Sequence, residues 1–236
     1  GASVINGVEA ALWDLKGKQA GLPVHALLGG CQHSKLPCYA TGGPANYPKD
    51  KLARKIDHYF SFGFRGIKVA TGSRSPDKGW YTPMTPAEAA DFEADKVAFM
   101  RQHAGPDAWL MLDGHMGNSP GKTWTVEIAI AAAKAVEPFN LFFFEEPLHY
   151  TDPWGYAELC RATTTPIAGG ECLTASYEWR VFASQDSFDI GQPDASYTGG
   201  MLECMAVAKM MAERGRKIAT HAWGAGGSLM QNIHYG

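Results

Sequence analysis

The sequence predicts an α/β fold in which short parallel β-strands alternate with α-helices around a barrel, and three observations lead to this prediction. Short apolar runs recur along the chain and are separated by segments of helical length. A length of 236 residues suits a single α/β barrel domain. Three successive apolar runs each end at a carboxylate: 109–112 before Asp113, 141–144 before Glu145, and 166–170 before Glu171.

The order of elements follows from apolar periodicity and from residues that begin or end helices. The chain opens inside a helix, because apolar residues between Val4 and Leu15 recur at helical spacing, and Gly21 with Pro23 ends it. Strands are expected near 37–41, 66–70, 109–113, 141–145, 166–170, 188–192 and 217–220. Helices are expected near 49–61, 85–103, 123–137, 153–161, 174–184 and 200–214. The stretch from Gly72 to Thr85 is expected to be one long polar loop.

Seven strands are one fewer than a closed barrel of this type needs. The chain also begins without a strand and ends at Gly236 without a last one. We therefore expect residues 1–236 to form a single catalytic barrel domain that is incomplete at both ends.

Composition excludes several classes of protein. Hydrophobic residues make up 45% and charged residues 19%, as in ordinary globular proteins. The formal net charge is −3 and lysine and arginine do not cluster, so we expect neither a nucleic-acid nor a membrane partner. The five cysteines are scattered, and no charged-then-apolar leader opens the chain, so a cytoplasmic location with reduced thiols is expected.

The three strand-end carboxylates predict a metal site. Parallel strands in one barrel bring their carboxyl ends to the same face, so Asp113, Glu145 and Glu171 should converge there. Clustered carboxylates repel one another unless a cation holds them, and ligation by oxygen alone suits Mg²⁺.

Strand alternation adds further candidates. Lys68 should point into the barrel together with Ala70, and His115 should share a face with Asp113. Asp194 and His221 follow two later strands, which favours an Asp–His pair in which the acid orients the ring and raises its basicity.

These residues belong to a set of motifs that resembles the mandelate racemase subgroup of the enolase superfamily. The resemblance implies a TIM-type (β/α)7β barrel, with Asp113, Glu145 and Glu171 binding Mg²⁺, Glu146 as a lesser candidate, and Asp194 with His221 as the base dyad. Members also carry an α+β capping domain before the barrel and an eighth strand, and neither is expected in this chain. The motifs run from end to end: residues 7–18, 22–23, 27–30, 63–68, Asp113, 145–147, 170–171, 192–194, 199–200 and His221.

Two departures from the racemases refine the expected reaction. Racemases of this group usually carry Lys-x-Lys on the second strand, where this chain has Lys68 and then Ala70, so the second base is missing. The Asp113-Gly114-His115 pattern resembles the galactonate dehydratase branch, which implies that His115 is the general acid for the departing hydroxyl. Lys68 would remain as a cation near the substrate carboxylate or the enediolate. The hypothesis is a Mg²⁺-dependent hydro-lyase that converts an acid sugar to a 2-keto-3-deoxy acid through a metal-stabilised enediolate.

Two alternatives remain open. One is a racemase or epimerase of a 2-hydroxy acid that uses His221 with Lys68 as the second base. The other is an inactive fragment or partner-binding piece, because the capping domain and last strand are absent. The resemblance further implies a homo-oligomer, from dimer to octamer, that acts on a small-molecule acid sugar.

Overall fold

The computed structural model describes residues 2–42, 48–75, 79–81, 85–117 and 123–236, and the chain divides into two compact units. The central unit comprises Cys38–Ala168 and Asp186–Phe188. The terminal unit comprises Gly1–Pro37, Gly169–Gln185 and Asp189–Gly236. Each unit has parallel strands of its own and helices packed beside them.

The central unit is built on parallel strands in the order β1-β2-β5-β6-β7. The two longest strands pair from Gly66↔Trp109 to Ala70↔Asp113, and the side chains of Ile67, Val69 and residues 110–112 are buried. This register places the carboxyl ends of neighbouring strands at one level. The strands are β1 (Ala40–Thr41), β2 (Gly66–Ala70), β5 (Trp109–Asp113), β6 (Phe143–Glu145) and β7 (Ile167–Gly169).

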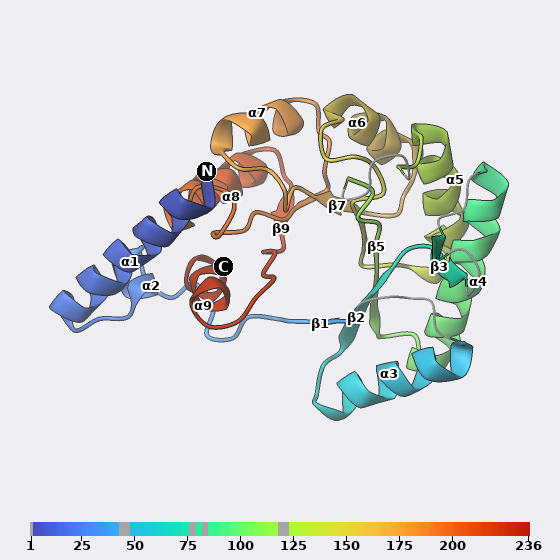
Figure 1. Ribbon diagram of the computed structural model, residues 1–236, viewed down its shortest axis with the longest axis horizontal. Coiled ribbons are helices and arrows are strands. Elements are labelled where there is room, and N and C mark those ends of the chain that lie inside the picture. Colours follow the sequence, from blue (N-terminus) through green and yellow to red (C-terminus); the bar gives the residue numbers. More distant parts are fainter. Residues whose placement is uncertain (1, 43–47, 76–78, 82–84, 118–122) are drawn as a thin grey trace. The chain divides into compact units, whose positions relative to one another are not determined.

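Helices of the central unit lie beside these strands (Figure 1), and side chains cap the amino-terminal ends of several of them. Thr85 lies just before Pro86, the first residue of its helix, and forms a reciprocal capping box with Glu88. These hydrogen bonds satisfy amide groups that the first helical turn leaves without partners. Thr125 caps the next helix by accepting from the Ile128 amide. The helices are α3 (Lys49–Ser61), α4 (Pro86–Ala104), α5 (Val126–Val136), the 3₁₀ helix η1 (Glu137–Phe139) and α6 (Pro153–Ala162).

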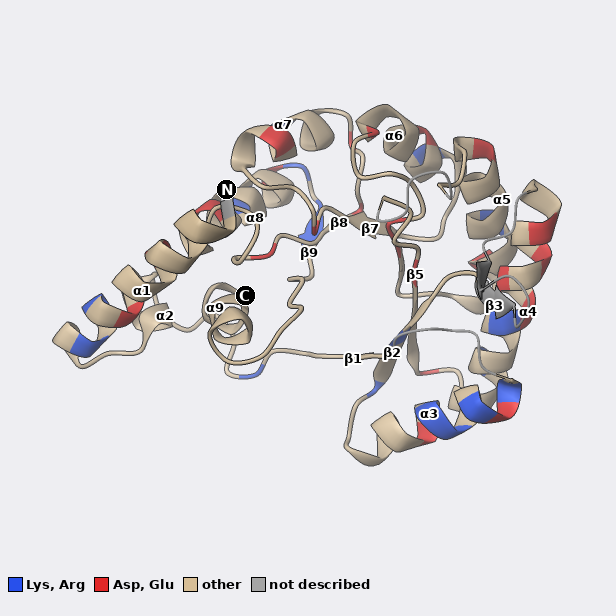
Figure 2. Ribbon diagram, viewed as in Figure 1, with Lys and Arg blue, Asp and Glu red and all other residues tan. Residues whose placement is uncertain are grey.

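Charged side chains of both signs lie on the helices of the central unit. Figure 2 shows basic and acidic positions interspersed on α3 and acidic positions concentrated on α4. Within the described part of the chain, no helix is long and apolar enough to cross a membrane.

The segment from Gly72 to Thr85 differs from the expected loop. Strands β3 (Ser73–Ser75) and β4 (Gly79–Tyr81) pair antiparallel, so the loop prediction was wrong for those residues. Polar residues dominate the stretch and favour a loop, but Trp80 and Tyr81 have high strand propensity and favour the strand β4. Positions 76–78 and 82–84 of the predicted loop lie outside the described residues.

The terminal unit combines both ends of the chain. Strands β8 and β9 are parallel, pairing Ile190↔Lys217 and Gly191↔Ile218, and within the same unit the Gln192 amide donates to the Gly169 carbonyl. Helix α9 was not predicted. The elements are α1 (Ala2–Ala20), α2 (Val24–Leu27), α7 (Ser176–Ser184), β8 (Ile190–Gly191), α8 (Met201–Glu213), β9 (Lys217–Ile218) and α9 (Gly227–Tyr235).

Helix α1 is joined to α8 by a buried apolar cluster and by one carboxylate. Trp13 of α1 packs against the cluster around Met201 and Cys204. Glu9 accepts from the Met201 amide (3.2 Å) and the Leu202 amide (3.4 Å), which places a negative charge at the positive end of α8. The motif at 7–18 therefore has a structural role in this unit.

Arg101 links α4 to two loops of the central unit. Its guanidinium donates to the carbonyls of Ala108 (2.7 Å), Phe139 (3.0 Å) and Asn140 (2.9 Å), and also to those of Gly105 and Pro106. The planar guanidinium of an arginine presents five N–H donors on three nitrogens, whereas a lysine has three donors on a single nitrogen.

Arg101→Met is therefore expected to lower the free energy of unfolding by about 2–4 kcal/mol, because several carbonyls lose a charged donor. Urea denaturation would measure the change. Arg54→Met is the matched control, because Arg54 makes an exposed pair with Asp50 (3.2 Å) and should cost less than about 1 kcal/mol. Equal losses in the two variants would contradict the assigned role.

Candidate active site

A buried cluster of charged groups in the central unit combines the carboxyl ends of β5 and β6 with a lysine from the middle of β2. Asp113 ends β5 and is the register partner of Glu145, which ends β6. The Lys68 ammonium of β2 lies 2.9 Å from Asp113 Oδ2 and 2.5 Å from Glu145 Oε2, and all three side chains are buried. The predicted inward direction of Lys68 is confirmed.

The charges of this cluster stabilise one another. Burial by itself would lower the pKa of Lys68, but the Glu145 and Asp113 carboxylates outweigh it and hold that pKa well above the ordinary value. Burial likewise opposes ionisation of Asp113, yet Lys68 and then His115 hold the pKa of Asp113 below its usual range. Near neutral pH the lysine is therefore cationic and Asp113 is anionic.

His115 lies just beyond the end of β5, where the backbone turns sharply. Its φ angle is 47°, and its Nδ1 atom lies 2.8 Å from Asp113 Oδ1. Gly114 permits this turn, because a Cβ atom there would overlap the backbone carbonyl of Glu146. The ring is about half exposed, so it remains accessible while Asp113 holds it. The predicted proximity of His115 and Asp113 is confirmed.

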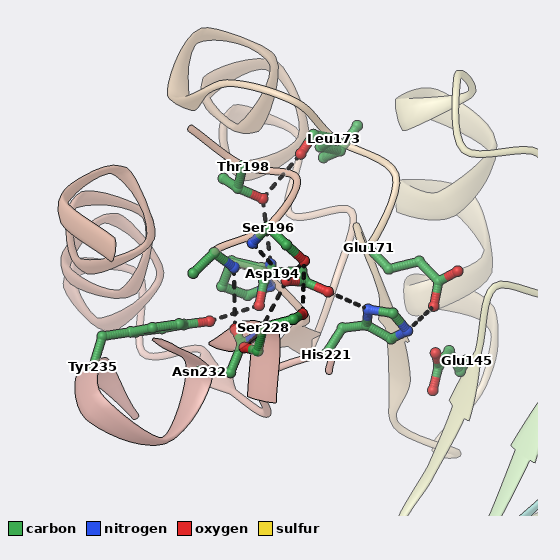
Figure 3. Close-up of polar contacts among 12 residues, drawn as sticks. Glu145, Glu171, Leu173, Asp194, Ser196, Thr198, His221, Ser228, Asn232 and Tyr235 are labelled. Carbon is green, nitrogen blue, oxygen red and sulfur yellow. Dashed lines mark hydrogen bonds and ion pairs between the residues drawn. The ribbon is translucent and has the colours of Figure 1, made fainter. Parts of the chain in front are cut away.

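The terminal unit carries a second cluster, which Figure 3 shows. His221 follows β9, and its Nδ1 atom lies 2.8 Å from Asp194 Oδ2, while its Nε2 atom lies 3.1 Å from Glu171 Oε2. All three side chains are largely buried. The structure thus brings together the expected Asp–His pair and places Glu171 beside it.

Hydrogen bonds keep Asp194 ionised. Burial opposes the charge, but His221, Ser196 and Asn232 donate to the carboxylate and lower its pKa below the usual value. A carboxylate that stays anionic can hold the Nδ1–H of the imidazole and leave Nε2 to accept a proton. This arrangement leaves Nε2, the nitrogen that faces Glu171, as the atom of His221 at which a proton could be exchanged.

A tight turn at Gly170 positions Glu171 after β7. Gly170 has a φ angle of 107°, and a Cβ atom at this position would collide with the indole of Trp179. Gly191 of β8 faces the same indole, which lies 3.0 Å from the position of a Cβ atom there. Trp179 is fully buried, so one side chain of α7 packs against both glycines.

Ser196, Ser228, Asn232 and Tyr235 contribute to the second cluster but were missing from the sequence-based candidates. Ser196 follows Asp194 by two residues, a spacing at which an aspartate commonly accepts from a nearby amide and hydroxyl. That spacing could have identified Ser196. The other three residues belong to α9, which lacked a recognisable sequence signal.

Charged groups at the carboxyl ends of parallel strands are typical of the α/β-barrel class. Residues 51–236 match the family model "Enolase C-terminal domain-like", and residues 2–29 match "Mandelate racemase / muconate lactonizing enzyme, N-terminal domain". The chain belongs to the enolase superfamily, in its mandelate racemase subgroup. The predicted fold class is thereby confirmed.

Several curated relatives are named for acid-sugar dehydration. Arabinonate dehydratase of Saccharolobus solfataricus is 31% identical over 234 residues, which cover 98% of this chain and 57% of the relative. L-talarate/galactarate dehydratase of Salmonella typhimurium is 34% identical over 218 residues, which cover 92% of this chain and 50% of the relative. This chain therefore spans about half the length of these relatives.

The fold is also shared with solved structures. L-talarate dehydratase from Polaromonas sp. JS666, complexed with Mg and L-glucarate, has 30% sequence identity and a TM-score of 0.80. The match covers 98% of this chain and 58% of that structure.

Proposed function

We propose that the protein is a Mg²⁺-dependent dehydratase of an acid sugar. It removes the carbon-2 proton of a 2,3-dihydroxy acid and expels the carbon-3 hydroxyl, giving a 2-keto-3-deoxy acid. The single observation that carries the proposal is that two histidines, His221 and His115, are each held by an aspartate. Dehydration needs one group to accept a proton and another to donate one.

In the proposed reaction His221 accepts the carbon-2 proton at Nε2, while Asp194 holds the proton on Nδ1. His115 donates a proton to the departing carbon-3 hydroxyl, which leaves as water, and the resulting enol becomes the 2-keto acid. Hydroxide is a poor leaving group, so elimination requires this donor. Lys68 contributes positive charge near the substrate carboxylate.

The carboxylates Asp113, Glu145 and Glu171 would hold the Mg²⁺ ion, with Glu146 as a lesser candidate. Asp113 and Glu145 support this assignment, since their buried oxygens lie on adjacent strands and are the hard donors that Mg²⁺ prefers. When bound, Mg²⁺ would draw electron density from the substrate carboxylate and so ease loss of the neighbouring proton.

Dehydration is favoured over racemisation by the residue at position 70. A racemase needs a proton acceptor on each face of the substrate, and position 70 is Ala70 in this chain.

The experiment that tests the proposal is a screen of aldonic and aldaric acids with Mg²⁺, read out as 2-keto acid formation. The expected result is Mg²⁺-dependent formation of a 2-keto-3-deoxy product from at least one compound, abolished by EDTA. Deuterium entering carbon 2 of both epimers in D₂O, without any 2-keto acid, would instead identify a racemase or epimerase.

Lys68→Met provides a second measurement that does not depend on turnover. Without Mg²⁺ the variant is expected to lose about 3–5 kcal/mol of unfolding free energy, because two buried carboxylates lose their cation. Mg²⁺ at about 100 times its Kd should restore about 2.7 kcal/mol. Thermal unfolding with Mg²⁺ and with EDTA would measure both changes, with the exposed Lys51→Met as control. A Lys68→Met melting curve that Mg²⁺ leaves unchanged would argue against the metal assignment.

A further inference from the structure

One polar face of α9 contacts the segment 193–196, which carries Asp194 (Figure 3). Ser228, Asn232 and Tyr235 share this face, because they are spaced by four and three residues. Ser228 Oγ donates to Ser196 Oγ (3.2 Å), and the Tyr235 hydroxyl donates to the Pro193 carbonyl (2.6 Å). The helix is therefore attached to residues on both sides of Asp194.

Asn232 lies at the centre of this face and bonds to Asp194 directly. Its Nδ2 atom donates to Asp194 Oδ1 (3.0 Å), and its Oδ1 atom accepts from the Ala195 amide (3.0 Å). A backbone amide only donates and a carboxylate only accepts, so the orientation of the Asn232 side chain is determined. The residue is only 2% exposed.

The Asp194 carboxylate consequently has little freedom to rotate. Oδ1 accepts from the Ser196 amide (2.7 Å), from Ser196 Oγ (2.6 Å) and from Asn232, whereas Oδ2 faces His221 Nδ1. Rotation of the carboxylate would break several charge-assisted hydrogen bonds together. The direction in which Asp194 holds the imidazole is thus set partly from α9.

We propose that Asn232 is a positioning residue for the base dyad. By fixing Asp194, it keeps the Nδ1 proton of His221 in place and Nε2 directed as the proton acceptor. Asn232 acts through Asp194 and does not itself contact the reacting atoms. The catalytic consequence rests on the proposed function, whereas the effect on the His221 ring does not.

Asn232→Leu and Asn232→Asp test this role. Asn232→Asp keeps the acceptor for the Ala195 amide but replaces the amide donor to Asp194 with a second carboxyl group, which competes for the same proton. It therefore remains informative if Asn232→Leu folds poorly. Both variants are expected to lower kcat by about 10–100-fold, as loss of supporting hydrogen-bond partners commonly does. KM should stay within about 2-fold, because Asn232 acts through Asp194 and is not proposed to contact the substrate. Gln231→Leu is the matched control, since the Gln231 side chain bonds within α9, to the Gly227 carbonyl, and should leave kcat unchanged.

The second readout is the imidazole N–H proton of His221 in protein labelled with ¹⁵N-histidine, assigned by its absence in His221→Asn. The resonance is expected to be sharp in the native protein and in Gln231→Leu, and broadened in both Asn232 variants. An unchanged resonance overturns the proposal, whether or not kcat falls. A broadened resonance in a protein that dehydrates no acid sugar keeps the positioning role and rejects only the dehydratase function.

Discussion

His221→Asn is expected to lower kcat for dehydration by about 10²–10⁴-fold, because asparagine cannot accept the carbon-2 proton. The imidazole lies between Asp194 and Glu171, at 2.8 Å and 3.1 Å, so its loss removes the assigned general base from this cluster. Exchange of the carbon-2 proton with D₂O should disappear together with dehydration. Product formation and ¹H NMR of the unreacted substrate would measure the two effects.

The chain offers a matched control for this substitution. His103 of α4 pairs with Asp57 at 2.8 Å but lies on the exposed helices of the central unit. His103→Asn should leave kcat unchanged and so report any general cost of losing an Asp–His pair. If His221→Asn retained the native rate, the assignment of the base would be wrong.

His115→Gln is expected to separate the two proton transfers. Dehydration should fall by about 10²–10⁴-fold, because the leaving hydroxyl loses its proton donor, while His221 remains able to exchange the carbon-2 proton. The expected result is deuterium at carbon 2 of recovered substrate in D₂O, with little 2-keto acid formed.

The same measurement discriminates between roles for His115. Loss of both exchange and dehydration would place His115 in substrate or metal binding rather than in proton donation. Native dehydration would remove it from the mechanism altogether. Melting temperatures of the native protein and the variant, measured in parallel, would separate either outcome from simple unfolding.

The strands and most of the helices could be predicted, because their sequences follow the apolar-inward rule. Residues 110–112 and 143–144, which lead to Asp113 and Glu145, are buried, and parallel pairing places the two carboxylates side by side. The ladders are shorter than the apolar runs, since β8 and β9 each pair over only two residues. An apolar run therefore predicts that a strand is present more reliably than it predicts the residue at which backbone pairing ends.

Helix α9 could not be predicted in this way, because its pattern is reversed. Asn232 is buried, whereas Leu229, Met230 and Ile233 are 40–47% exposed. A search for an apolar helix face finds the exposed side of α9. The polar residues that bond Asp194 then resemble the solvent-facing side of an ordinary helix. A polar inward face becomes recognisable only when its hydrogen-bond partners are known.

The proximity of His115 to Asp113 was predicted for a reason that is only partly correct. Alternation along a strand assumes extended backbone, but β5 ends at Asp113 and His115 has a positive φ angle. The turn at Gly114 brings the ring back to the carboxylate. Local backbone geometry of this kind depends on the close approach of Glu146, which apolar periodicity does not encode.

The packing of Trp179 against Gly170 and Gly191 has a practical consequence for altering substrate choice by directed evolution. A methyl group at either glycine would meet the indole, so most variants in a library at these three codons are expected to lose stability. Diversity is better introduced at solvent-facing positions after the strands, such as Trp223, which is 75% exposed two residues beyond His221. The residues that pack the interior and the exposed residues after the strands thus occupy separate positions, so the exposed residues can be varied while the packed ones are kept.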